Sequence, residues 1–319
     1  MSKSIRTLVR GASLTVALAA VISGRTNAQD AKLTRSDLIV SSDWLAKQLE
    51  NPKLVLFHVG EKQEYDAGHI PGARYLELSD ISSPPTRDTT KLALEMLPVD
   101  QLRERLEKLG ISDDSRVVIY YGNDWVSPST RALLTLQYVG LGSRASILDG
   151  GMVEWKKGDR PITTEVPAAP RPGKLTARAA LPVIVDAGFV QSHIRKPGYT
   201  IVDARNTIFY DGPVQEMGGN GMRHTVVPGH VPGAVNIVFE SVYDDTNHLL
   251  PDARLREMFA QAGIKPNDTI VAYCHVGQQA TALLLAAEAL GYNVKLYDGS
   301  FQDWQMRKLP VESSRKDGQ

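Results

Sequence analysis

An internal repeat constrains this fold more than any other feature, because the second half of the chain contains the motifs of the first half in the same order. His69-Ile70-Pro71-Gly72-Ala73 recurs as His230-Val231-Pro232-Gly233-Ala234. Each copy then has a short apolar run, a loop, a helical pattern that ends near a glycine, and an Asp-Gly turn that precedes a tryptophan. The matched pairs are 117–120 with 270–273, 130–139 with 279–290, Gly140 with Gly291, 148–151 with 297–300, and Trp155 with Trp304. The shared order indicates a duplication and predicts two similar domains.

Short apolar runs alternate with helical segments in each copy. In the second copy we predict a helix over 184–194, strands over 199–202 and 235–238, a helix over 253–262, a strand over 269–273, a helix over 279–290 and a strand over 293–297. This alternation is typical of a mostly parallel sheet that helices cover on both faces. The predicted fold class is therefore α/β, with two tandem domains, each a mostly parallel sheet flanked by helices.

The predicted domains extend over residues 38–161 and 181–313. Between them, four prolines lie among small and polar residues from position 161 to position 180. Such a composition favours an extended segment on the surface. We therefore expect residues 162–180 to be a linker.

The start of the chain has the pattern of a secretory signal. Basic residues precede an apolar stretch over 12–22, and Thr26-Asn27-Ala28 places small residues where a signal peptidase cuts. The stretch is shorter than the ~20 residues that span a bilayer. We predict that residues 1–28 are a signal peptide and that the protein is exported, to the periplasm or the extracellular space. An uncleaved anchor is the alternative.

The charge balance gives no sign of a nucleic-acid partner. The full chain has 36 basic and 36 acidic residues, and the leader holds four of the basic ones, so the trimmed chain has 32 minus 36, a net charge of −4. A protein that binds phosphate backbones normally presents an excess of lysine and arginine. No stretch after the leader is long and apolar enough to be predicted as a membrane span.

Cys274 is the only cysteine, so no internal disulfide can form, although exported proteins often contain them. It follows an apolar strand and stands just before a helix, at the sheet edge where α/β proteins bind ligands. The intervening loop residues are His275, Val276, Gly277, Gln278 and Gln279. A loop this short can turn its amides toward the sulfur beside the positive end of the helix, which favours the thiolate. A small buried core residue is the alternative interpretation.

The C-terminal copy resembles a rhodanese domain. The resemblance is carried by Val202-Asp203-Ala204-Arg205, Gly229 with the turn that follows it, Tyr273-Cys274-His275-Val276-Gly277-Gln278-Gln279-Ala280, and Tyr297-Asp298-Gly299-Ser300 with Trp304. The first copy keeps the segment 68–73 and the turn 149–151. The chain therefore resembles the tandem-domain rhodanese, or thiosulfate sulfurtransferase, family from about residue 41 to residue 311.

This resemblance implies a mechanism for Cys274. Its thiolate would take a sulfane sulfur from a donor such as thiosulfate, and an acceptor, cyanide or a thiol, would remove that sulfur from the resulting persulfide. The loop amides would stabilise both states. The expected partners are thus a small-molecule sulfur donor and acceptor, with no metal and no organic cofactor.

Other marked residues receive supporting roles. Asp203 and Arg205 are expected to support the site, because the first copy has His58-Val59-Gly60 at the matching positions and therefore lacks the acid–arginine pair. A surface salt bridge is the alternative. We assign His275 to substrate contact or the rim of the site instead of a general base. His69 and His230 recur in a turn and are expected to make structural hydrogen bonds, and the two repeated tryptophans to pack in the core.

The first copy has Tyr121 where the repeat predicts a cysteine, followed by a longer loop over 122–129. An inactive amino-terminal copy is usual in two-domain members of the family that this chain resembles. We therefore expect the first domain to be catalytically inactive and to form one wall of an active-site cleft.

We predict that donor binding differs from that of the better-known rhodaneses, which carry a second arginine four residues after the one that matches Arg205. This chain has Phe209 there. The insertion over 217–228 contains Arg223, which is a candidate to replace the missing charge. A solvated loop is the alternative.

Rival functions come from other classes. A cysteine-dependent phosphatase needs an arginine at the end of the loop, where this chain has Gln279-Ala280-Thr281. A cysteine protease needs a histidine base close to the thiol in space, which the sequence cannot exclude, but the repeated motifs match no protease. A non-catalytic sulfur-binding or docking module remains open, as does 3-mercaptopyruvate sulfurtransferase, whose loops commonly have Cys-Gly-Ser-Gly where this chain has His275 and Val276 after the cysteine.

Overall fold

A computed structural model describes residues 32–84, 88, 90–122, 126–211, 215–219, 222–226 and 228–313, with the backbone alone for 215–219 and 222–226. The predicted signal peptide, residues 1–28, lies outside the described residues. Within them, no helix has the length and apolarity needed to cross a membrane.

The first half is a five-stranded parallel sheet in the order β1-β5-β4-β2-β3. Its strands are β1 (Ile39–Val40), β2 (Leu54–His58), β3 (Arg74–Tyr75), β4 (Arg116–Tyr120) and β5 (Ala145–Leu148). The helices are α1 (Arg35–Leu38), α2 (Ser42–Ala46), α3 (Lys62–Ala67), α4 (Leu78–Ile81), α5 (Val99–Lys108), α6 (Ser127–Tyr138), the 3₁₀ turn η1 (Gly142–Arg144) and α7 (Gly151–Lys157).

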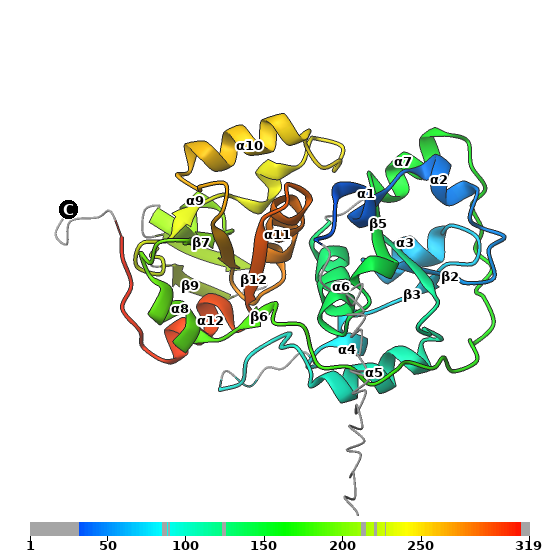
Figure 1. The fold of residues 1–319 in the computed structure, drawn as a ribbon, viewed down its shortest axis with the longest axis horizontal. Coiled ribbons are helices and arrows are strands. Elements are labelled where there is room, and N and C mark those ends of the chain that lie inside the picture. The colour runs from blue at the N-terminus through cyan, green and yellow to red at the C-terminus, as the bar shows by residue number, and fades with distance from the viewer. Residues whose placement is uncertain are drawn as a thin grey trace, which may run out of the picture. The chain divides into compact units, whose positions relative to one another are not determined.

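The second half repeats this topology with the parallel order β10-β7-β11-β12-β6 (Figure 1). Its strands are β6 (Ile184–Val185), β7 (Tyr199–Asp203), β10 (Val235–Asn236), β11 (Thr269–Tyr273) and β12 (Asn293–Tyr297). The helices are α8 (Ala187–His193), α9 (Thr207–Asp211), the 3₁₀ turn η2 (Phe239–Val242), α10 (Asp252–Gln261), α11 (Gln279–Ala289) and α12 (Ser300–Met306). The predicted fold class is confirmed.

Three predicted elements differ from the structure by more than one residue at an end. The helix predicted over 130–139 begins already at Ser127, so the loop predicted over 122–129 ends at residue 126. The helix predicted over 184–194 begins only at Ala187, because Ile184 and Val185 are β-branched residues that pair with β12 as an edge strand. Asp186 then caps the helix by accepting a hydrogen bond from the Phe189 amide at 2.8 Å. The strand predicted over 235–238 ends at Asn236.

The insertion near residue 220 forms an antiparallel pair, β8 (Gln215–Gly219) with β9 (Met222–Val226). The Arg223 side chain falls outside the described part of the chain, so its role in donor binding stays a prediction.

The repeated tryptophans anchor equivalent corners of the two halves. Trp155 and Trp304 are fully buried, and their indole N–H groups donate to the carbonyls of Pro161 (3.0 Å) and Pro310 (2.8 Å). The predicted packing role of both is confirmed. Each tryptophan thereby fastens the segment that leaves its domain.

The two halves meet along α6 and α11, which pack side by side (Figure 1). The hydroxyl groups of Thr130 and Thr281 are 2.8 Å apart in this contact. These threonines occupy equivalent positions of the repeat, so the interface lies close to a local two-fold axis. Equivalent positions also pair at the ends of the helices, where Gln278 donates to Ser127 Oγ at 3.1 Å.

Candidate active site

Cys274 lies directly after β11 and is fully buried. Its amide donates to Ser300 Oγ at 3.2 Å, and its carbonyl accepts from the Phe301 amide at 3.0 Å. The Ser300 hydroxyl in turn donates to the Tyr297 carbonyl at 2.9 Å. These hydrogen bonds therefore hold the backbone of Cys274 against the start of α12 and do not involve its thiol.

The loop after Cys274 runs over residues 275–278 into the first turn of α11. Among the described residues, the backbone N–H groups of 275–278 donate no hydrogen bond. Gly277 has φ +78°, and a Cβ atom at this position would lie 2.5 Å from the Asp298 carbonyl. The predicted need for glycine in this turn is confirmed. Unpaired amides beside a helix N-terminus form a setting suited to an anion.

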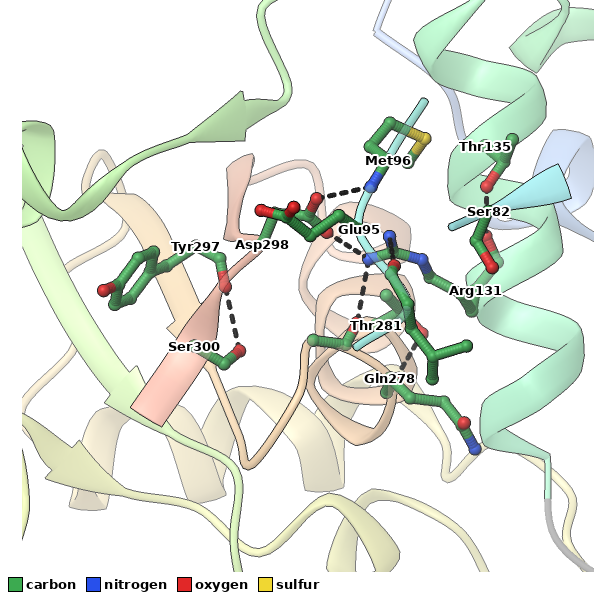
Figure 2. Close-up of polar contacts among 12 residues, drawn as sticks. Ser82, Glu95, Met96, Arg131, Thr135, Gln278, Thr281, Tyr297, Asp298 and Ser300 are labelled. Atoms are coloured by element: carbon green, nitrogen blue, oxygen red, sulfur yellow. Dashed lines mark hydrogen bonds and ion pairs between the residues drawn. The ribbon is translucent and has the colours of Figure 1, made fainter. Parts of the chain in front are cut away.

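Arg131 of α6 reaches from the first half to brace this loop (Figure 2). Its guanidinium donates to Asp298 Oδ1 at 2.6 Å, to the Gly277 carbonyl at 3.0 Å and to the Leu94 carbonyl at 2.6 Å. The side chain is 1% exposed. Asp298 also accepts from the Met96 amide at 2.6 Å. Sequence reasoning missed Arg131, because no motif marks it and its partners lie in the other copy.

Asp203 and Arg205 form a buried ion pair beside the cysteine. The Arg205 guanidinium donates to both Asp203 carboxylate oxygens, the shortest contact being 2.6 Å, and to the Gly229 carbonyl at 2.6 Å. It also lies 3.9 Å from the centre of the Phe301 ring. Burial alone would lower the pKa of Arg205, but the contacts with Asp203 outweigh it and raise that pKa. The alternative of a surface salt bridge is wrong, since both side chains are buried.

His275 is half-buried and packs edge-on against Phe209, with ring centres 4.6 Å apart. Burial, followed by the nearby Arg205 charge, lowers the pKa of His275 to about 4. The ring is therefore neutral at neutral pH. Phe209, which stands where the better-known rhodaneses have the second arginine, thus contacts His275, the first residue of the loop.

The remaining loop residues face different surroundings. Gln278 contacts Ser127 of the first half, as described above. The side-chain oxygen of Gln279 is buried and has no hydrogen-bond partner in the described part of the chain. Val276 is half-buried.

In the first half, Tyr121 occupies the place of the cysteine. It is buried, and its hydroxyl donates to the Asn247 carbonyl at 2.7 Å. Gly151 stands where the second half has Ser300, and both have positive φ, +52° and +53°. A Cβ atom on Gly151 would lie 2.7 Å from the Tyr121 ring. The glycine thus makes room for the Tyr121 ring, which is larger than a cysteine side chain. The phenol hydroxyl of Tyr121 cannot carry sulfur as a thiol does.

The turn histidines make the predicted structural contacts. The Nδ1 atom of His69 is 2.8 Å from the Tyr65 carbonyl, and that of His230 is 3.2 Å from the Tyr210 carbonyl. Each ring stacks on the ring of the same tyrosine. This prediction is confirmed in both copies. Within the described ranges, no group of three or more His, Cys, Asp or Glu side chains is placed to hold a metal ion.

A cavity of about 480 Å³ has Glu95 of the first half and Asp298 and Asp303 of the second among its lining residues. Cys274 is not among them. Burial and the nearby Asp298 and Asp303 charges raise the pKa of Glu95. Both halves therefore line this cavity.

Residues 41–158 and 186–307 match the rhodanese-like domain family. The chain is 31% identical to the sulfur carrier protein TtuD of Thermus thermophilus, over 84% of this chain and 93% of that protein. It is 28% identical to the thiosulfate sulfurtransferase of Rattus norvegicus, over 88% of this chain and 95% of that protein. The crystal structure of SseA from Escherichia coli, described as a 3-mercaptopyruvate sulfotransferase with the rhodanese fold, is similar with a TM-score of 0.67 and 24% identity, over 82% of this chain and 98% of that one.

Proposed function

This chain belongs to the rhodanese-like family of sulfurtransferases, and we propose that it moves a sulfane sulfur from thiosulfate to cyanide or a thiol through a persulfide on Cys274. The observation that carries the proposal is the loop after the cysteine. The amides of 275–278 are without hydrogen bonds in the described structure and precede the first turn of α11. This arrangement supports a thiolate and a persulfide anion.

The chemistry proceeds in two half-reactions. The Cys274 thiolate attacks the outer sulfur of thiosulfate, a new S–S bond forms, and the old S–S bond breaks to release sulfite. The acceptor nucleophile then attacks the outer sulfur of the persulfide and regenerates the thiolate. Arg205 lies near Cys274 and is held there by its ion pair with Asp203. The attack by a thiolate involves no proton, so this step requires no proton transfer by His275.

The donor is tested by comparing thiosulfate with 3-mercaptopyruvate on the purified protein. The two substrates share the transferred sulfur but differ in charge and in leaving group. We expect thiosulfate to load one sulfur atom onto the protein, visible by intact-mass measurement, and to give the higher kcat/KM. A higher kcat/KM with 3-mercaptopyruvate would make that compound the donor. A docking module would acquire no sulfur from either.

Phe209→Arg is expected to lower the KM for thiosulfate about ten- to hundredfold, because a charge-assisted contact contributes roughly 1.5–3 kcal/mol. Phe209 packs against His275 at the start of the loop, so a guanidinium there would face the donor. Phe209→Leu is the matched control, since it removes the ring contact without adding charge. Arg223→Ala should raise the KM several-fold if Arg223 holds the donor. An unchanged KM in both the Phe209→Arg and Arg223→Ala variants would exclude this mode of donor binding.

The first domain is proposed to be catalytically inactive, with Tyr121 at the place of the cysteine and residues 162–180 as the linker to the second domain. Its contribution is to brace the loop through Arg131 and Ser127. This proposal extends the predicted cleft-wall role to direct contacts with the loop.

Export is proposed from the leader pattern of residues 1–28, and we expect cleavage after Ala28. Amino-terminal sequencing of the protein from the extracytoplasmic fraction checks this, with Gln29 as the expected first residue. Recovery of an intact Met1 in that fraction would instead support an uncleaved anchor. Recovery only from the cytoplasm would contradict export.

A further inference from the structure

Cys274 is fully buried, so a sulfur donor can reach its thiol only after part of the structure moves. Residues 91–94 of the first half, here called the strap, belong to no helix or strand and lie beside the loop that follows the cysteine. Arg131 donates both to the Leu94 carbonyl of the strap and to the Gly277 carbonyl of the loop, at 2.6 and 3.0 Å. A segment without regular structure can move while both sheets stay intact.

Gln302 of α12 joins the strap to the loop around the cysteine. Its side-chain carbonyl accepts from the Ala93 amide at 3.1 Å, and its side-chain amide donates to the Lys91 carbonyl at 3.3 Å. The backbone N–H of Gln302 donates to the His275 carbonyl at 3.0 Å. A single residue of the second half therefore holds the strap against the position next to Cys274.

The residues that follow the strap are fixed within the first half. The Glu95 amide donates to Ser83 Oγ at 2.8 Å, and the Glu95 carbonyl accepts from the Ser83 amide at 2.9 Å. The Leu94 carbonyl is held by Arg131, as described above. Rotation about the N–Cα bond of Leu94 would move residues 91–93 and leave this carbonyl in place. Leu94 is therefore the point at which the strap can swing.

The second half contains an equivalent segment. Asp149 and Asp298 are equivalent residues, and each accepts from a backbone amide of the other half. The donors are Leu249 at 3.2 Å and Met96 at 2.6 Å, the second of which Figure 2 shows. Counting two residues back from each donor gives the residue at which each segment turns.

These turning residues are Asn247 and Leu94, and both have positive φ, +60° and +56°. Asparagine adopts this left-handed conformation at small cost, whereas a leucine side chain disfavours it. The segment of the second half is thus relaxed. The strap beside Cys274 instead holds its closed position at a cost in backbone strain, which opening would relieve.

We propose that residues 91–94 close the active site, that the strap opens by rotation at Leu94, and that Gln302 is the positioning residue that holds it shut. The open strap admits the donor, and the closed strap shields the persulfide from water and from other thiols. This role of the strap rests on the proposed function of Cys274, but its opening can be measured without sulfur transfer.

The test is the rate at which iodoacetamide alkylates the full chain, because Cys274 is the only cysteine and reacts only when it is reached. Gln302→Ala should raise this rate about fivefold or more, since two hydrogen bonds to the strap are lost. Leu94→Asn should lower the rate about threefold or more, because asparagine relieves the strain of the closed strap. A general loosening of the fold would not produce opposite changes in the two variants.

Gln305→Ala is the matched control, because it removes the same type of side chain from an exposed position of α12. It should react at the rate of the unaltered chain. All variants should keep the same pH midpoint of alkylation, since the strap changes access to the thiol and not its ionisation. The alkylation rates keep their meaning even if thiosulfate loads no sulfur, so failure of the strap and failure of the proposed function are distinguishable.

An unaltered rate in Gln302→Ala, a faster rate in Leu94→Asn, or a shifted pH midpoint that accounts for the changes would overturn the proposal. So would a rate in the unaltered chain that rises with urea as steeply as global unfolding does, because Cys274 would then react only in the unfolded state. We expect a weak dependence on urea, which is typical of the opening of a short segment.

Discussion

Cys274→Ser is expected to reduce sulfur transfer to the uncatalysed background and to abolish the persulfide. The hydroxyl is a far weaker nucleophile than a thiolate at neutral pH and cannot form a stable S–S bond. The chain contains no second cysteine that could substitute. The measurements are steady-state turnover with thiosulfate and cyanide, and intact mass after incubation with thiosulfate alone.

The fold should survive this substitution, which separates loss of chemistry from loss of structure. The thiol makes no hydrogen bond in the described structure, and the contacts that fix residue 274 come from its backbone. Cys274→Ala is the matched control, with a similar volume and no polar atom to bury. Both variants should unfold near the temperature of the unaltered chain. A sulfur adduct in either variant would show that another group carries the sulfur.

Arg131→Met is expected to have the second-largest effect, on both stability and the rate of sulfur loading. It leaves Asp298 without its buried cation, and breaking a buried pair in this way costs roughly 3–5 kcal/mol in the free energy of unfolding. It also frees the Gly277 carbonyl, which Arg131 holds at 3.0 Å. Because that carbonyl belongs to the loop around Cys274, we expect persulfide formation to slow at least about tenfold.

Arg103→Met is the matched control. Arg103 pairs with Asp100 at the same distance, 2.6 Å, but the Asp100 side chain is 73% exposed. Surface pairs of this kind contribute about 0–1 kcal/mol. Denaturant unfolding, together with single-turnover sulfur loading measured without denaturant, distinguishes the two roles of Arg131. A lower stability with an unchanged loading rate would restrict Arg131 to a structural role.

The sequence was sufficient for elements whose signals are local. The strands over 269–273 and 293–297 match the prediction residue for residue, because apolar runs bounded by turn residues determine them. The glycine of the loop was predictable for the same reason, since its positive φ belongs to the turn itself. The edge strand β6 was not, because two β-branched residues beside a helical pattern acquire strand geometry only by pairing with β12.

The site was predictable only as far as its motif extends. Cys274, its loop and the Asp203–Arg205 pair lie within short repeated segments that can be compared between the copies. Arg131 lies in a helix with no such motif, and its function depends on which residues of the other copy it meets.

The threonine pair at the junction of α6 and α11 has a consequence for how such a chain can change. Equivalent positions that touch one another are the mark of a symmetric dimer, in which every substitution occurs twice. In a single polypeptide with two copies, a substitution changes one copy and leaves the other as it was. Arg131 can face a loop in one direction while its repeat partner, Ala282, carries no charge, and Tyr121 can stand where the other copy has Cys274. Because the two copies are joined in one chain, each can acquire a different role, which two identical subunits cannot do.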